Sequence, residues 1–420
     1  MNTVFSLSLS LRVILPFALG YYLSYLFRTI NSVIAPNLLA DVGLNAGGLG
    51  LLTGVYFLSF AIFQLPLGVL LDRMGPRKTE ALLLLLAALG SLYFALAESA
   101  SGLVLARALI GVGVSACLMA SFKAFVDWFP KNQLPLTNGL ILMAGGFGAM
   151  SSTIPVEAAL QVTGWREVFL GLATLSVVAA AAVYFIVPER PKELKNSRDE
   201  SIGNQIRGMK FIIKEPVFYR YVPIFVLSMG TLLAVQSLWV GPWLRDVSGM
   251  DRSGVADTLF VVAVAMTGGY LVIGAVASQF NRKGYKTETV VIFGMIIFML
   301  AQAGLIAGSQ TGVVFLWCMF AFFGTSSSVI YAALFQHFEK HLIGRVSTMT
   351  NLLIFLCAFL MQWSIGVIIN LFPTTADGGF STAGYMTAYG VMLILQLIGL
   401  IWIWISQYFF LSTTRGEKVP

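Results

Sequence analysis

An arginine lies deep inside an otherwise apolar stretch near the start of the chain. The stretch reads YLFRTINSVIAP from Tyr25, and Arg28 is its one charged residue. Spacings of four, three and four residues place four side chains on one helical face: Tyr21, Tyr25, Arg28 and Ser32. Two phenols, a guanidinium and a hydroxyl, with Asn31 beside them, could bind a small solute.

The positive charge of Arg28 has no evident partner in the sequence. A guanidinium keeps its proton at any ordinary pH, and an arginine at the centre of a bilayer costs between ~2.5 and more than ~10 kcal/mol. The acidic residues fall toward the ends of the apolar stretches. Glu80 is expected at a helix end, and Glu157, after Pro155, comes closest to the interior. The sequence therefore favours an anionic ligand for Arg28, with bonds to backbone carbonyls or to Glu157 as the alternative.

The composition indicates an all-α, polytopic membrane protein. Of the 420 residues, 58% are hydrophobic and 11% are charged, whereas soluble domains carry about 25% charged residues. Apolar runs recur along the chain, each long enough to cross roughly 30 Å of hydrocarbon. They predict twelve transmembrane helices, at 13–36, 48–70, 79–97, 103–126, 137–160, 166–187, 221–243, 256–279, 288–307, 312–335, 347–371 and 385–410.

The basic residues are unequally distributed between the two sides of these spans. One side receives Arg166, Arg245 and Arg252, while Arg28 and Arg107 lie inside spans. Nearly all the others of the 26 Lys and Arg fall on the side of the two termini. Because lysine and arginine mark the cytoplasmic side, we expect an inner-membrane protein with both termini in the cytoplasm. This bias accounts for the net charge of +7, which therefore does not indicate nucleic-acid binding.

A polar segment divides the predicted spans six and six. The expected parts are an amino-terminal six-helix bundle at 1–187, a cytoplasmic linker at 188–220 and a carboxy-terminal six-helix bundle at 221–420. From Ser201 the linker carries apolar residues on one helical stripe and basic residues elsewhere. This pattern predicts a short helix on the anionic membrane surface, with a solvated linker as the alternative.

The loop after the second predicted span has a specific pattern, and residues 68–78 read GVLLDRMGPRK. Gly68 permits close helix packing, and Gly75 permits a tight turn between two helices. Asp72 can accept hydrogen bonds from neighbouring helix N-termini or from Arg73. The basic residues would hold the loop at the cytoplasmic surface, but a simple basic loop does not explain the spacing of the glycines and the aspartate.

This pattern, G-x-x-x-D-R-x-G-x-R-K, resembles the signature loop of the major facilitator superfamily. A degenerate copy, GAVASQFNRKGYK, follows at 274–286, about half a chain later. The resemblance implies two pseudo-symmetric six-helix halves and a secondary transporter that works by alternating access. It also implies a substrate site between the halves and a cytoplasmic latch formed by Asp72, Arg73 and Arg77.

Two arginines refine this resemblance. Arg107 begins an R-x-x-x-G-x-G sequence that resembles a second superfamily pattern, frequent in proton-driven members, so a structural or coupling role is expected for it. An arginine at the depth of Arg28 resembles the organic-anion and organophosphate transporters, which hold the negative group of their substrate there. The organophosphate carriers have another arginine in span seven, where this chain has Gln236 and Trp239. An anion with one acidic group, such as a monocarboxylate, therefore fits better than a phosphate ester.

The predicted solute site also draws on polar residues of other spans, although such residues often bridge helices in membranes. We expect an anionic solute and membrane lipid as partners, and a monomeric protein. A coupling proton could travel through Glu157 or on the substrate, or one anion could exchange for another. Besides the residues of the first span, the candidates are Tyr56, Gln64, Gln236, Trp239, Tyr331, Asn351 and Gln362.

Two other functions are compatible with the sequence. The Arg107 pattern and the aromatic interior suggest drug/proton efflux, but exporters of cationic drugs usually need a buried acid, which this sequence is expected to lack. A non-transporting membrane sensor on the same fold is the alternative from another class. The sequence has no nucleotide-binding loop, paired-acid hydrolytic site or metal-ligand spacing, so we expect neither an enzyme nor a cofactor or metal. The three cysteines lack paired spacing and are expected as free thiols.

Overall fold

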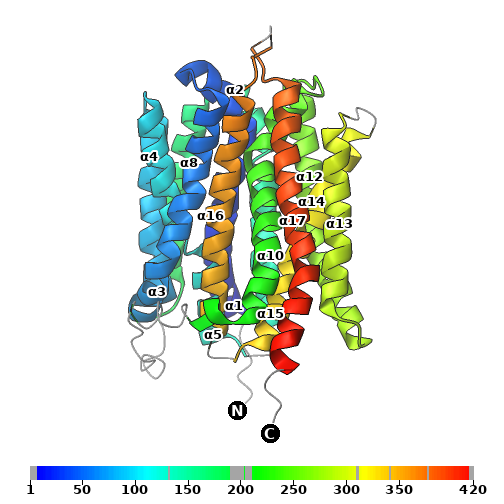
Figure 1. The fold of residues 1–420 in the computed structure, drawn as a ribbon. Coiled ribbons are helices and arrows are strands. Elements are labelled where there is room, and N and C mark those ends of the chain that lie inside the picture. Colours follow the sequence, from blue (N-terminus) through cyan, green and yellow to red (C-terminus); the bar gives the residue numbers. More distant parts are fainter. Residues whose placement is uncertain are drawn as a thin grey trace.

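The structure is a computed structural model, and it describes residues 7–130, 133–189, 203, 211–308, 312–339, 342–375 and 378–415. The regular elements of this part of the chain are helices that run side by side (Figure 1). A π-helical turn at Val235–Trp239 and a 3-10 turn at Thr325–Val329 interrupt two of them. The α-helices are α1 (Leu7–Thr29), α2 (Asn31–Val42), α3 (Ala46–Leu96), α4 (Ala100–Gly113), α5 (Cys117–Trp128), α6 (Leu134–Ser151), α7 (Ile154–Leu160), α8 (Trp165–Ile186), α10 (Pro216–Ala234), α11 (Val240–Asp246), α12 (Arg252–Arg282), α13 (Thr287–Ile306), α14 (Val313–Gly324), α15 (Ile330–His337), α16 (Ile343–Ile369) and α17 (Thr382–Arg415).

Helix α3 is long enough for two membrane spans. It has 51 residues, or roughly 76 Å at 1.5 Å per residue, more than twice the hydrocarbon thickness of about 30 Å. Gly75 interrupts it with a φ of 78° and a ψ of 165°, a conformation that glycine adopts without steric cost. The predicted turn between the spans at 48–70 and 79–97 therefore lies at Gly75.

Several predicted spans are broken near their centres. Helices α1 and α2 meet at Ile30, residues 114–116 separate α4 from α5, and residues 152–153 separate α6 from α7. The π turn joins α10 to α11, and the 3-10 turn joins α14 to α15. Eleven helical segments of the described chain are long and apolar enough to cross a membrane. Because α3 counts twice, the twelve predicted spans are confirmed.

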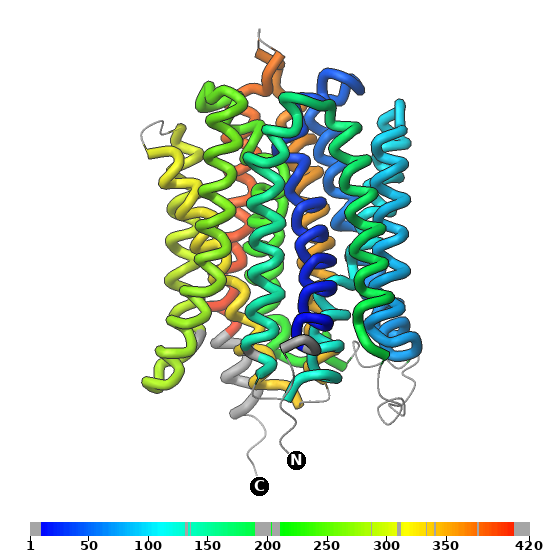
Figure 2. The backbone as a smooth tube through the Cα atoms, turned by 180° about the vertical axis from the view of Figure 1, so that it is seen from behind, coloured from blue at the N-terminus to red at the C-terminus, as the bar shows by residue number. Residues whose placement is uncertain are grey.

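Helices from the two parts of the sequence stand on opposite sides of the bundle. Figure 1 shows α3, α4 and α8 on one side and α12, α13 and α14 on the other, and Figure 2 gives the same arrangement from behind. We call α1–α8 the first group and α10–α17 the second group. The groups meet where α3 packs against α16 and α6 against α12. Helix α1 begins and α17 ends at the same end of the bundle, which we call the terminal end.

The surface helix predicted from Ser201 lies almost wholly outside the described residues. Residues 203 and 211–214 are helical, and α10 starts shortly after them, at Pro216. The prediction therefore stays untested. The three cysteines are free thiols, as expected, and Cys117 and Cys357 are buried while Cys318 is half-buried.

We predict that Gly113→Ala destabilises the fold. A Cβ added to Gly113, at the end of α4, would lie 2.3 Å from the backbone nitrogen of Ala87 in α3. Backbone atoms cannot rotate away, so the two helices must separate, and such overpacking typically costs about 1–3 kcal/mol. We expect a lower unfolding temperature in detergent. Gly171→Ala in α8 is the matched control, because its Cβ would meet nothing within 4 Å. Equal unfolding temperatures for the two variants would contradict the prediction.

Candidate functional site

A central cavity lies between the two groups of helices. Its volume is about 400 Å³, within the range of roughly 300–1,000 Å³ typical of ligand pockets. Among the described residues that line it, Arg28 is the charged one, and none is Asp or Glu. The other polar lining residues come from both groups: Tyr21, Ser24, Tyr25, Gln64, Ser115, Thr267, Tyr270, Ser328, Tyr331 and Asn351.

Arg28 is held in the cavity wall by the end of α1 and by aromatic rings. It lies in the last turn of α1, where the carbonyl ends of the helix favour a cation. Its Cζ atom is 4.3 Å from the centroid of the Tyr25 ring and 5.4 Å from that of Phe355, distances typical of cation–π contacts. The side chain is 5% exposed, and its buried Nε–H has no hydrogen-bond partner. The Nε–H of Arg28 is therefore available to donate a hydrogen bond to a ligand. The positive charge of Arg28 is not balanced by any acidic side chain among the described lining residues.

Tyrosines from three helices surround this arginine. The rings of Tyr21 and Tyr25 meet edge to face with centroids 5.2 Å apart. On the opposite wall, Tyr331 donates a hydrogen bond of 2.5 Å to Oδ1 of Asn351. Tyr270 of α12 also lines the cavity and was not among the predicted residues. Its sequence signal is only a tyrosine after two glycines in an apolar span, which does not distinguish a pocket residue from a packing residue.

Six predicted residues line the cavity and five do not. Arg28, Tyr21, Tyr25, Gln64, Tyr331 and Asn351 line it. The structure places the other five in helix contacts or in the buried interior: Asn31, Tyr56, Gln236, Trp239 and Gln362.

The outlying residues satisfy polar groups between helices. Asn31 donates to Oγ1 of Thr53 over 2.8 Å, and Tyr56 donates to the carbonyl of Ser24 over 3.0 Å. The Trp239 indole donates to the carbonyl of Gln362 over 3.1 Å, while Gln236 is buried. These residues lie on the expected spans, but Asn31, Tyr56 and Trp239 point toward neighbouring helices and not into the cavity.

Arg107 is a structural link to the first span. It is fully buried, and its Nη1 donates to the carbonyl of Phe27 over 2.8 Å. Its Cζ atom lies 5.0 Å from the centroid of the Tyr56 ring. Arg107 thus holds the backbone directly before Arg28, and it does not line the cavity.

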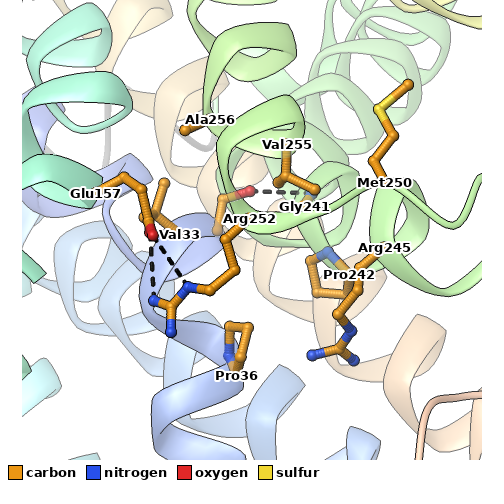
Figure 3. Close-up of a pocket in the computed structure, with 11 residues that line it drawn as sticks. Val33, Pro36, Glu157, Gly241, Pro242, Arg245, Met250, Arg252, Val255 and Ala256 are labelled. Carbon is orange, nitrogen blue, oxygen red and sulfur yellow. Dashed lines mark hydrogen bonds and ion pairs between the residues drawn. The ribbon is translucent and has the colours of Figure 1, made fainter. Parts of the chain in front are cut away.

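The end opposite the termini is closed by contacts between the two groups. Arg252 of α12 pairs with Glu157 of α7, at 3.0 Å from Nε to Oε1 and 3.3 Å from Nη2 to Oε2. Figure 3 shows the two side chains facing each other. Ser32 Oγ donates to the carbonyl of Leu238 and accepts from the amide of Gly241, over 3.2 and 3.1 Å. Glu157 therefore neutralises Arg252, and the alternative in which it neutralises Arg28 is wrong.

The cavity beside this ion pair is small. The close contact between α3 and α16, which we call the seam, also helps to close this end. That cavity holds about 30 Å³, far less than the few hundred Å³ of a ligand pocket. Along the seam between α3 and α16, a Cβ on Gly366 would lie 2.3 Å from the carbonyl oxygen of Ala46. The rings of Phe60 and Phe355 continue the seam toward the central cavity, with centroids 4.3 Å apart.

At the terminal end, the residues of the predicted latch bond within the first group. Lys123 pairs with Asp72, and Arg77 donates to the carbonyl of Tyr184 over 2.8 Å. Arg73 is exposed. The signature loop is therefore anchored to α5 and α8 in this conformation.

A further cavity lies toward the terminal end of the second group. It holds about 500 Å³ and is lined by the last turns of α12, including Ser278 and Arg282. Ser328 lines both this cavity and the central one. Ser328 therefore lies between the two cavities, while the contacts described above close the opposite end.

The chain belongs to the Major Facilitator Superfamily, whose family model matches residues 17–359. It is therefore a membrane transporter of that superfamily and not an enzyme. Figures 1 and 2 show the two groups of helices on opposite sides of the bundle.

Curated relatives and solved structures agree with this assignment. The chain is 23% identical to a hexuronate transporter of Bacillus subtilis (strain 168), over 92% of this chain and 94% of the relative. It is 25% identical to a probable L-galactonate transporter of Escherichia coli (strain K12), over 90% and 86%. A bacterial homologue of the human lysosomal transporter Spinster, in an inward-facing and occupied conformation, has a TM-score of 0.77 at 16% identity, covering 97% of this chain and 98% of that one.

Proposed function

We propose that this protein carries a small organic anion across the inner membrane by alternating access, and that Arg28 binds the negative group of the substrate. The observation that carries the proposal is a buried, unbalanced guanidinium in a cavity whose described lining residues include no Asp or Glu. In a low-dielectric site the charge of an anion is the natural complement to that cation. Tyr21, Tyr25 and Gln64 of the first group would bind its polar groups, together with Tyr331 and Asn351 of the second.

The cavity favours a substrate with one acidic group. Of the lining residues that the structure describes, one has a cationic side chain, and the hydroxyl and amide groups around Arg28 suit an anion that also carries neutral polar groups. Sugar acids have this chemistry, and hexuronate and L-galactonate appear in the names of the relatives. A proton that accompanies the anion, or exchange against a second anion, would balance the charge.

We propose that this conformation is open to the cytoplasm. The basic residues gather on the side of the termini, and such residues mark the cytoplasmic side.

The halves would be residues 1–187 and 221–420, joined by 188–220 and acting as a monomer. When they rock, the ion pair of Glu157 and Arg252 would break. Asp72, Arg73 and Arg77 would then contact the second half.

A thermal-unfolding screen of the purified protein tests the proposal. We would compare galacturonate and L-galactonate with matched cationic and neutral solutes. A ligand at ~100 times its dissociation constant adds about 2.7 kcal/mol of stability, a clear shift in the unfolding temperature. We expect stabilisation by anions. Stabilisation confined to amphipathic cations would instead support drug efflux and overturn the proposal.

We predict that Glu157→Gln opens the end opposite the termini. The loss of a half-exposed ion pair is worth about 1 kcal/mol or less, or up to about a fivefold change in the open fraction. A cysteine at Val33, which lines the small cavity there, reports opening through its labelling by an impermeant thiol reagent. The native cysteines are first replaced.

A double-mutant cycle with Arg252→Gln provides the control for this prediction. If the two residues act as a pair, the double variant labels no faster than Glu157→Gln alone. Additive effects, or labelling at the parental rate, would show that the ion pair does not hold this end closed.

A further inference from the structure

Glu80 is a buried carboxyl group that the proposed anion site does not use. It follows the Gly75 turn in α3 and is 0% exposed. Within the described part of the chain, neither of its oxygens has a hydrogen-bond partner. The sequence places Glu80 at a helix end, but the structure buries its side chain against the middle of α1. An ionised carboxylate in such a place is very costly, so burial favours the neutral acid, and the carboxylate form needs support from a nearby positive charge.

The space for this carboxyl is made by one glycine of α1. A Cβ on Gly20 would lie 2.2 Å from Oε1 of Glu80, so any larger residue would displace the acid. The next residue, Tyr21, lines the central cavity, as does Ser24 one turn further on. Arg28 lies two turns beyond Gly20, about 12 Å away by the helix rise. The acid and the cation are therefore placed along the same helix.

Among the described lining residues of the central cavity, Arg28 is the charged one, and it lies on α1, the helix whose Gly20 faces Glu80. Asp72 and Lys123 neutralise each other, and Arg107 is fixed on the Phe27 carbonyl. The remaining ionisable or charged side chains on the helices packed around Glu80 are Arg12, Tyr21, Tyr22 and Tyr25 of α1, Tyr56, Arg73, Arg77, Lys78 and Tyr93 of α3, Cys117 and Asp127 of α5, and Arg166, Glu167 and Tyr184 of α8.

We propose that Glu80 binds the proton that accompanies the anion, an inference that rests on the proposed anion transport. When the cavity is empty, the unbalanced Arg28 favours the carboxylate of Glu80, whose proton leaves to water. When an anion neutralises Arg28, that support is lost, and the carboxylate takes a proton to form a new O–H bond. Anion and proton therefore promote each other's binding, and the pair crosses the membrane with no net charge.

The test measures galacturonate affinity and proton uptake as functions of pH. In the parental protein, affinity should rise as the pH falls through the titration of Glu80, and binding should take up a proton. Glu80→Gln is permanently neutral, so it should keep the high affinity of low pH at every pH and take up no proton. In proteoliposomes, this variant should retain anion exchange and lose uptake driven by a pH gradient.

Controls separate this inference from the proposed function. Glu98→Gln removes an exposed carboxyl of the same half and should leave the pH dependence unchanged. Arg28→Gln should abolish affinity at every pH, and failure of that arm would reject the anion site itself. If Glu80→Gln does not fold, Glu80→Asp is used, and its pH midpoint should move. Two results would overturn the role of Glu80. One is a Glu80 variant whose affinity depends on pH in the same way as that of the parental protein. The other is a parental protein whose affinity does not depend on pH and which takes up no proton on binding.

Discussion

Arg28→Gln is expected to reduce anion affinity by at least ~100-fold while leaving the fold intact. A hydrogen bond to a charged group contributes about 1.5–3 kcal/mol, and a guanidinium can make two with one carboxylate. About 2.7 kcal/mol corresponds to 100-fold in affinity. The glutamine keeps a polar side chain in the cavity, and it removes a buried charge whose Nε–H has no partner. Binding is measured by calorimetry with galacturonate, and the fold by thermal unfolding.

Two matched variants sharpen this prediction. Arg28→Lys keeps the charge but loses the planar fork, so we expect an intermediate affinity. Arg12→Gln removes an exposed arginine from the same helix and should bind as the parental protein does. Full affinity in a folded Arg28→Gln protein would return Arg28 to a structural role.

Gly241→Ala is expected to shift the protein toward the conformation that is open opposite the termini. A Cβ on Gly241 would lie 2.1 Å from the carbonyl oxygen of Ser32, and this contact joins α11 to α2 across the two groups. Overpacking there costs about 1–3 kcal/mol. This cost corresponds to a roughly 5- to 150-fold change in the ratio of the conformation open at this end to the closed conformation. The clash disappears when the groups separate, so the cost falls on the closed state.

Labelling of the cysteine at Val33 measures this shift, and we expect faster labelling in Gly241→Ala. Gly268→Ala on α12 is the control, because its added Cβ would meet nothing within 4 Å. If Gly241→Ala lowers the unfolding temperature without changing the labelling rate, the glycine supports the fold and does not control opening.

Much of the fold follows from the sequence for simple physical reasons. Twenty apolar residues must span a bilayer, so the number and order of the spans are largely determined by composition. Gly75, in the signature loop, marks the turn that divides α3. The breaks at Ile30 and at 325–329 were not predicted, because hydropathy is the same on both sides of them.

The site was predicted less completely than the fold. Arg28 and the two tyrosines of α1 were found because a buried charge and a helical stripe are visible within one segment. The position of Tyr270 in the cavity wall and the burial of Glu80 depend on how neighbouring helices rotate and tilt. Side-chain packing determines these rotations and tilts, and it cannot be read from one segment of the sequence. Trp239 and Gln362 were expected in the pocket and instead bond to each other across helices.

The central claim is that this protein moves an organic anion and that Arg28 holds it. The most direct measurement is galacturonate counterflow in proteoliposomes that contain either the parental protein or Arg28→Gln. The account predicts saturable flux with the parental protein and none above background with the variant. Tight binding by the parental protein without any flux would indicate a non-transporting sensor, and equal flux through both proteins would contradict the role of Arg28.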